Sequence, residues 1–183
     1  MGGPKLDFQV IATTLMGAMN ESVSGFLKVK QDKEPTIVTK PLYVEDKWNV
    51  SSYGEFIDGS YISVIYFYRH AKDRGTNNYC GMLVLIITNS IVNYMVKGFG
   101  YKNSQEAGAE MAADIAAELA NNIAGVFKKD LSGVGYPELE ISAPMKFKGF
   151  AVGLDYPKGE KQFHRVTSFV WGQRIVADVI LGL

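Results

Sequence analysis

The two halves of the chain show the same order of secondary-structure signals. Each half has a long amphipathic helical segment, then a proline (Pro41 or Pro144), and then three segments with strand character. Such a pattern predicts an internal duplication, with pseudo-repeats at about residues 5–88 and 103–183. Helices followed by runs of strands favour an α+β fold over an alternating, parallel one.

Three helices are predicted. They cover residues 7–29, a short stretch from 88 or 89 to about 98, and about 104–130. In the first, apolar residues recur at spacings of three and four, which is typical of a helix packed on a core. The third begins at Ser104, whose side chain can accept a hydrogen bond from the free N–H groups of a helix start.

The strands are predicted from runs of β-branched and aromatic residues between turn-forming residues. An extended stretch follows Pro41, and the other runs cover 61–68, 79–88, 145–155, 163–172 and 174–181. Residues 157–161 indicate a hairpin turn, and 46–60 and 70–78 indicate surface loops. We therefore predict a single domain over residues 1–183, an antiparallel six-stranded sheet system with three helices packed on it.

Composition excludes several classes of function. Lys plus Arg equals Asp plus Glu at 19 each, so no nucleic-acid partner is expected. Cys80 is the only cysteine, which indicates a reducing, cytoplasmic location and an unreactive core thiol. The sequence shows neither a signal-peptide pattern nor an uninterrupted apolar run of about 20 residues, so no membrane segment is expected. His70 and His164 lack ligand spacing, so no metal site is expected.

The candidate site lies on the predicted helix around Ala113–Gly125. At about 100° per residue, Asp114, Glu118 and Asn121 fall on one polar stripe. The opposite, core-facing side holds Ala112, Ile115, Ala116, Leu119, Ile123 and Val126, and the stripe is flanked by Ala113, Ala117 and Ala124. A carboxylate and an amide would then project one turn apart from a flat, open surface. Such residues are usually only solvated, so the surrounding pattern has to decide.

The pattern Asp114-x3-Glu118-x2-Asn121, with Pro144 following, resembles the motif of the CheC/CheX-type phosphatases, which dephosphorylate response regulators. The segments AAELANNIAG (116–125) and LEISAPMKFKG (139–149) are similar to family segments as well. The resemblance implies a CheC-like fold over nearly the whole chain and a homodimer. The C-terminal strand is apolar enough to be a covered sheet edge, which is compatible with a dimer.

The resemblance also implies roles for these residues. Glu118 would pair with the lysine beside the phospho-aspartate of a CheY-type receiver domain, and Asn121 would orient the attacking water. Because the partner would supply Mg²⁺, no cofactor of the chain's own is expected. Asp114 and Pro144 are interpreted as structural supports.

The first helix contains a degenerate copy of the motif. Aligning Asn20 with Asn121 puts Gly17 at the position of Glu118 and Thr13 at that of Asp114. With no glutamate there, we predict one active helix, as in CheX, and we interpret Gly17 as a residue that permits close helix packing.

One alternative stays open: a non-catalytic module that binds response regulators or serves in assembly, as in flagellar-switch relatives. Trp48, Tyr53 and Phe56, in the predicted loop 46–60, could form a partner surface, although packing beneath the loop is the simpler interpretation.

Overall fold

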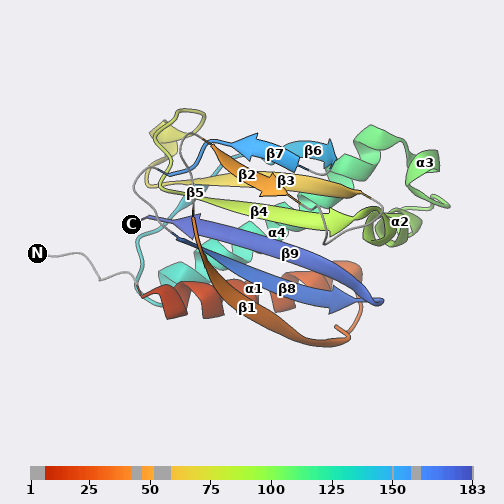
Figure 1. Ribbon diagram of the computed structural model, residues 1–183, viewed down its shortest axis with the longest axis horizontal. Helices are drawn as coiled ribbons and strands as arrows, with labels where there is room; N and C mark the ends of the chain where they lie inside the picture. Colours follow the sequence, from red (N-terminus) through yellow and green to blue (C-terminus); the bar gives the residue numbers. More distant parts are fainter. Residues whose placement is uncertain (1–6, 43–46, 52–58, 150, 158–161, 183) are drawn as a thin grey trace, which may run out of the picture.

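Figure 1 shows the computed structural model, in which a twisted antiparallel sheet carries its long helices on one face. The structure describes residues 7–42, 47–51, 59–149, 151–157 and 162–182. The helices are α1 (Phe8–Leu27), α2 (Asn89–Lys97), α3 (Ser104–Ala107) and α4 (Ala109–Gly133), with a 3-10 turn η1 (Ala71–Asp73). The strands are β1 (Lys33–Pro41), β2 (Trp48–Ser51), β3 (Ser60–Tyr68), β4 (Gly81–Thr88), β5 (Glu140–Ile141), β6 (Met145–Gly149), β7 (Ala151–Leu154), β8 (Gln162–Val170) and β9 (Gln173–Leu181).

The main sheet has the order β1-β8-β9-β4-β3-β5, and β6 also pairs with β3. A separate two-stranded sheet is formed by β2 and β7. The α+β class and the antiparallel pairing are confirmed, but the expected six strands are too few for the described part of the chain. The main sheet has an internal symmetry in its strand order. From one edge the order is β1-β8-β9, and from the other edge it is β6-β3-β4, so β1, β8 and β9 occupy positions equivalent to β6, β3 and β4. Duplication would produce this arrangement, although the pseudo-repeats and the single domain stay predictions.

The sheet is buried on both faces. In β3, the side chains of Tyr61, Ile65 and Phe67 join the core beneath the helices. The alternate residues Ile62 and Val64 join a second cluster, which is covered by β2 and β7. Burial on both faces explains why β3, β4 and β9 are nearly continuous apolar runs. None of the helices in the described ranges has the length and apolar character needed to cross a membrane.

Local side-chain contacts fix the starts of α1 and α2. The Asp7 carboxylate accepts a hydrogen bond from the backbone N–H of Gln9 at 2.9 Å. The Tyr136 hydroxyl in turn accepts from the backbone N–H of Asp7 at 2.9 Å. In α2 the cap is Thr88, which accepts from the backbone N–H of Ile91 at 3.1 Å. These contacts satisfy N–H groups that a helix start leaves free.

The single helix expected over 104–130 is divided in the structure. Gly108 has φ 85° and separates α3 from α4, a left-handed conformation that glycine adopts without steric cost. Asn103, not Ser104, caps α3 by accepting from the backbone N–H of Glu106 at 2.9 Å. The helical composition on both sides of Gly108 hides this break from a sequence pattern.

The first edge strand was misplaced by the sequence pattern. We expected an extended stretch after Pro41, whereas Pro41 is the last residue of β1. This strand is mostly exposed and rich in Lys, Thr and Pro, so it lacks an apolar alternation. Part of the predicted loop 46–60 is strand β2, whose Trp48 packs on Phe163 with ring centroids 5.1 Å apart. Burial in the core is thus confirmed for Trp48, while Tyr53 and Phe56 lie outside the described residues.

The strand predicted over 145–155 is two strands in two sheets. β6 pairs with β3, whereas β7 pairs with β2. The hairpin predicted through 157–161 is also wrong, because β8 pairs with β1 and β9 and not with β7. Residues 158–161 themselves lie outside the described ranges.

The C-terminal strand is not a sheet edge, which corrects another expectation. β9 lies between β8 and β4 in the centre of the sheet. The outer strands are β1 on one side and β5 with β6 on the other, as Figure 1 shows. A dimer formed through the C-terminal strand is therefore excluded by its pairing, and the homodimer stays a prediction that light scattering can test.

His164 is a buried residue of β8 whose ring lies 5.8 Å, between centroids, from that of Phe8 on α1, so its protonation should affect stability. Its Nδ1 is 2.9 Å from the Thr39 hydroxyl, and burial lowers the pKa of the imidazole below 6.5. As the pH falls from about 6.5 toward that lower pKa, the unfolded chain binds a proton that the folded chain does not. The free energy of unfolding should therefore fall over this window, by no more than about 1.4 kcal/mol per pH unit.

Urea titrations from pH 7.5 to 5 measure this effect. His164→Gln should remove the imidazole contribution, whereas His70→Gln, at an exposed position, should leave it in place. A wild-type slope that survives in His164→Gln would rule out the assignment.

Candidate functional site

The candidate site lies on α4, which packs beside α1 on one face of the sheet. The two helices run antiparallel (Figure 1). The α4 residues expected to face the core are buried, with the exception of the half-buried Val126: Ala112, Ile115, Ala116, Leu119 and Ile123. On the outer side, Asp114 and Glu118 are exposed and Asn121 is half-buried. The predicted division of the helix into a buried face and a polar stripe is thus present.

The alanines differ from the prediction. Ala117 is 5% exposed and Ala124 is 0% exposed, so both are part of the packed interface and do not flank the stripe. The reason is that α4 contacts α1 on one side and β3 and β6 on the other, which buries a wider arc than one core face would. The exposed stripe around Glu118 is consequently a narrow ridge between two packed neighbours.

Glu118 and Asn121 are available to a partner. The Asn122 side-chain amide donates to the Glu118 backbone oxygen at 2.9 Å and lies 3.4 Å from its Oε1. Within the described residues, Glu118 forms no ion pair and the Asn121 side chain forms no hydrogen bond. The Glu118 carboxylate, which accepts only this long bond from Asn122 among the described residues, and the Asn121 amide therefore lie three residues apart on the outer side of α4.

Asp114 has a partner that the sequence reasoning missed. Its carboxylate forms an ion pair with Lys146 on β6, and this hydrogen bond raises the pKa of Lys146. The pair joins α4 to the strand that follows Pro144, and it neutralises the other carboxylate of the motif. Both side chains are partly exposed, so the pair positions these elements more than it stabilises the fold. Strand alternation, which puts Lys146 and Lys148 on one face, was the available signal.

Pro144 lies at a break between two strands. β5 pairs with residues 67–68 of β3, and β6 pairs with residues 60–64. Between them, the Ser142 N–H donates to the Tyr66 carbonyl oxygen at 2.9 Å, and its hydroxyl accepts from the Tyr66 N–H at 3.0 Å. Proline has no N–H to contribute to a strand ladder and therefore suits this break.

The degenerate copy on α1 does not present equivalent groups. The Thr13 hydroxyl donates to the Gln9 carbonyl oxygen of its own helix at 2.8 Å. Asn20 accepts a hydrogen bond from the Gln31 side chain at 2.7 Å. Gly17 is exposed, and a Cβ there would have nothing within 4 Å, so its interpretation as a close-packing residue is wrong.

Gly17→Ala should stabilise the protein. An exposed glycine inside a helix costs about 0.5–1 kcal/mol relative to alanine, and nothing here obstructs the added methyl group. Chemical denaturation should show a gain of about this size. Gly81→Ala is the matched control, because its Cβ would lie 2.6 Å from Leu181 Cδ1 and 2.8 Å from the Ile180 oxygen. That variant should lose stability, and equal effects of the two would contradict the prediction.

Other potential reactive groups are not assembled into a centre. Among the described residues, no three His, Cys, Asp or Glu side chains are close enough to hold a metal ion. The half-buried Cys80 thiol donates to the Phe67 oxygen at 3.5 Å. The pKa of this thiol is raised by burial, and the opposing effect of Arg69 is smaller. A raised pKa agrees with the predicted unreactive side chain.

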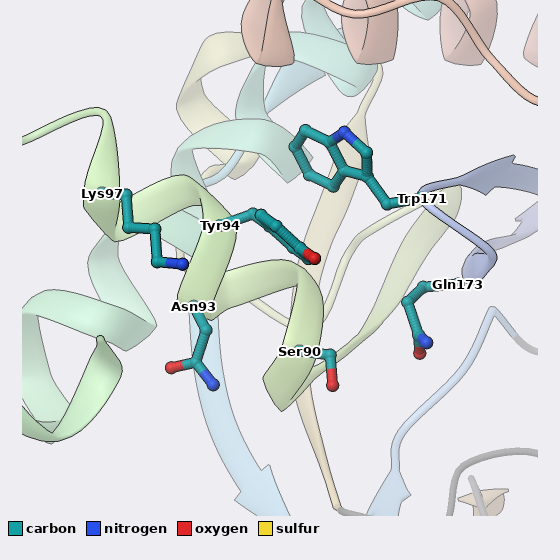
Figure 2. Close-up of a pocket in the computed structure, with 6 residues that line it drawn as sticks. All are labelled: Ser90, Asn93, Tyr94, Lys97, Trp171 and Gln173. Atoms are coloured by element: carbon teal, nitrogen blue, oxygen red, sulfur yellow. The ribbon is translucent and has the colours of Figure 1, made fainter. Parts of the chain in front are cut away.

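A pocket of about 280 Å³ between α2 and the turn after β8 contains none of the motif residues. Figure 2 shows Trp171 stacked over Tyr94, with ring centroids 4.4 Å apart. Lys97 Nζ lies 5.2 Å from the centre of the Tyr94 ring. Asn93 points away to α3, where its side-chain oxygen accepts from the Ser104 N–H at 2.7 Å. These contacts join α2 to α3 and to the turn after β8.

Comparisons with known proteins agree on one family. The model of the chemotaxis phosphatase CheX family matches residues 75–167, about half of the chain. This range contains Asp114, Glu118, Asn121 and Pro144 and leaves out the degenerate copy on α1. No curated protein matches the sequence.

Solved structures share the fold at low sequence identity. A CheC-like superfamily protein from Shewanella sp. PV-4 has a TM-score of 0.65 and 14% identity, covering 95% of this chain and 97% of the other. A chemotaxis protein CheX from Desulfovibrio desulfuricans has a TM-score of 0.63 and 15% identity, covering 93% and 98%. A CheX–CheY–BeF3–Mg²⁺ complex from Borrelia burgdorferi has a TM-score of 0.56 and 14% identity, covering 98% and 100%. The CheC-like fold is thus established, and with the family match, the chain belongs to the CheX family of chemotaxis phosphatases.

Proposed function

We propose that this protein hydrolyses the aspartyl-phosphate of a CheY-type response regulator, with Glu118 and Asn121 entering the partner's phosphorylation site. The observation that carries the proposal is the pair on the outer side of α4: a carboxylate that forms no ion pair within the described residues and an amide that forms no hydrogen bond there. Support also comes from the CheX family match and from the Borrelia complex, in which a CheX is bound to CheY.

The two side chains suit different tasks. Glu118 can form a charge-assisted hydrogen bond with the lysine of the receiver site, which anchors and orients the complex. An amide does not act as a general base near neutral pH, but the Asn121 oxygen can accept a hydrogen bond from water and direct its lone pair at phosphorus. Phosphoryl transfer depends mainly on positioning and on charge neutralisation, so an orienting residue is sufficient help.

The remaining chemistry belongs to the partner in this proposal. The receiver domain supplies the phospho-aspartate, the lysine and Mg²⁺, and water attacks phosphorus as the aspartate oxygen leaves. A narrow ridge, instead of a deep cleft, is the shape that can enter another protein's site. The reaction would take place in the cytoplasm, and a homodimer would present two such ridges.

The experiment is phosphate release from a phosphorylated receiver domain with and without this protein. Catalysis requires that a substoichiometric amount of the protein shortens the lifetime of the phospho-aspartate through many turnovers. Binding to the receiver with an unchanged lifetime would instead support the non-catalytic module and reject the phosphatase proposal.

A further inference from the structure

A second pocket lies on the sheet face opposite the helices, away from the α4 ridge. Its volume is about 590 Å³, within the usual range for small-molecule sites. The lining residues come from β3, the loop before β4, the β5–β6 segment and the end of β7. Figure 1 shows the loop between β3 and β4 at the same end of the sheet as β5.

Three tyrosines and one carboxylate converge on this pocket. The rings of Tyr66 and Tyr79 are 4.5 Å apart between centroids, and the Tyr66 hydroxyl donates to the Asp155 carbonyl oxygen at 3.3 Å. Tyr68 lines the same pocket and is only 2% exposed.

The lining of this pocket includes the Asp155 carboxylate, whose negative charge favours a cation. Burial, Tyr79 and Asp155 raise the pKa of Tyr66 to about 12, and burial and Asp155 also raise the pKa of Tyr79. Arg74 is the cationic residue of the lining, and it is paired with Glu140. Lys47 is 4.0 Å from Asp155, and both side chains are more than half exposed, so that pair is weak.

The apolar part of the lining selects the kind of cation. Ile141, Ala143 and Met145 provide apolar surface beside the tyrosine rings. Apolar groups cannot replace the water molecules that a hydrated metal ion would give up in this pocket. The described residues also form no cluster of metal ligands. Alkylated ammonium ions match aromatic faces, a carboxylate and apolar contacts together. We propose that this pocket binds a small alkylated ammonium ion, held by the rings of Tyr66 and Tyr79 and by the Asp155 carboxylate.

The test uses choline chloride as the probe, titrated into the full chain and followed by NMR. The neutral control is 3,3-dimethylbutan-1-ol, which has the shape of choline without the charge, and sodium chloride controls for ionic strength. We expect saturable choline binding with a dissociation constant in the millimolar range. The alcohol should bind at least about tenfold more weakly than choline. No saturable choline binding, or equal binding of the two probes, would overturn the proposal.

Variants locate the binding. Asp155→Asn, at an exposed side chain, and Tyr79→Leu should each weaken choline binding about five- to tenfold. Tyr94→Leu, which removes an aromatic ring from the pocket of Figure 2, should leave it unchanged. Choline binding that persists in both pocket variants, or that is lost in Tyr94→Leu, would reject this location.

Discussion

Asn121→Ala should lower the rate of phosphate release from a phosphorylated receiver domain by about 10²-fold or more, with little effect on binding. A catalytic water held by one amide loses its orientation when that amide is removed, and misplacement of a reacting group by about 1 Å costs a factor of this size. Asn121 is half-buried on a folded helix and has no internal hydrogen bond to lose, so the fold should tolerate the change.

Glu118→Ala should behave differently. Loss of a charge-assisted hydrogen bond should weaken association with the receiver about tenfold or more, and the reaction rate at saturation should fall as well. Asn20→Ala on α1 is the matched control, because it changes the equivalent position of the degenerate copy and should leave phosphate release unchanged. Similar turnover of wild type and Asn121→Ala would remove Asn121 from the mechanism.

The largest effect on stability is expected at Asp178. Its carboxylate is 0% exposed and accepts two hydrogen bonds from Arg165, from Nε and Nη2, each at 2.7 Å. The two residues are cross-strand neighbours in β8 and β9, on the sheet face away from the helices. Asp178→Ala leaves a nearly buried guanidinium without this carboxylate, which should cost about 3–5 kcal/mol of unfolding free energy.

Chemical denaturation of three variants separates the pair from its packing. Asp178→Ala and Arg165→Ala should both lose much stability, whereas the double variant Arg165→Met with Asp178→Leu should recover most of it. Apolar replacement of a whole buried ion pair is often neutral or stabilising, because no charge remains to be desolvated. A double variant as unstable as Asp178→Ala would show that the loss comes from packing.

The sequence predicted elements whose burial is visible in their own residues. β3, β4, β8 and β9 lie within two residues of the expected ranges. β3, β4 and β9 are covered on both faces, and such strands are nearly continuous apolar runs. β1 was missed as an exposed edge strand, and β2 because it is a short strand inside a polar segment. The break at Gly108 depends on one backbone angle, φ 85°, that neighbouring residues do not reveal.

In the candidate site, too, the features that depend on local spacing were predicted, and those that depend on tertiary neighbours were not. Helical periodicity was sufficient to place Glu118 and Asn121 on the outer side of α4, since it needs only local spacing. The Asp114–Lys146 pair joins residues 32 positions apart, and the Asn20–Gln31 bond depends on how the chain turns after α1. Ala117 and Ala124 were misassigned because burial on a second side of a helix depends on tertiary neighbours.

The claim that α4, and not α1, enters the receiver site can be tested by alkylation of matched cysteines. In a Cys80→Ser background, Asn122→Cys reports on α4 and Glu21→Cys on the equivalent position of α1, both at exposed residues. Alkylation rates are measured with and without a saturating, beryllofluoride-activated receiver domain, using variants that keep phosphatase activity. We predict that the receiver slows alkylation at position 122 and leaves position 21 unchanged. Slowing at position 21, or none at position 122, would contradict the account.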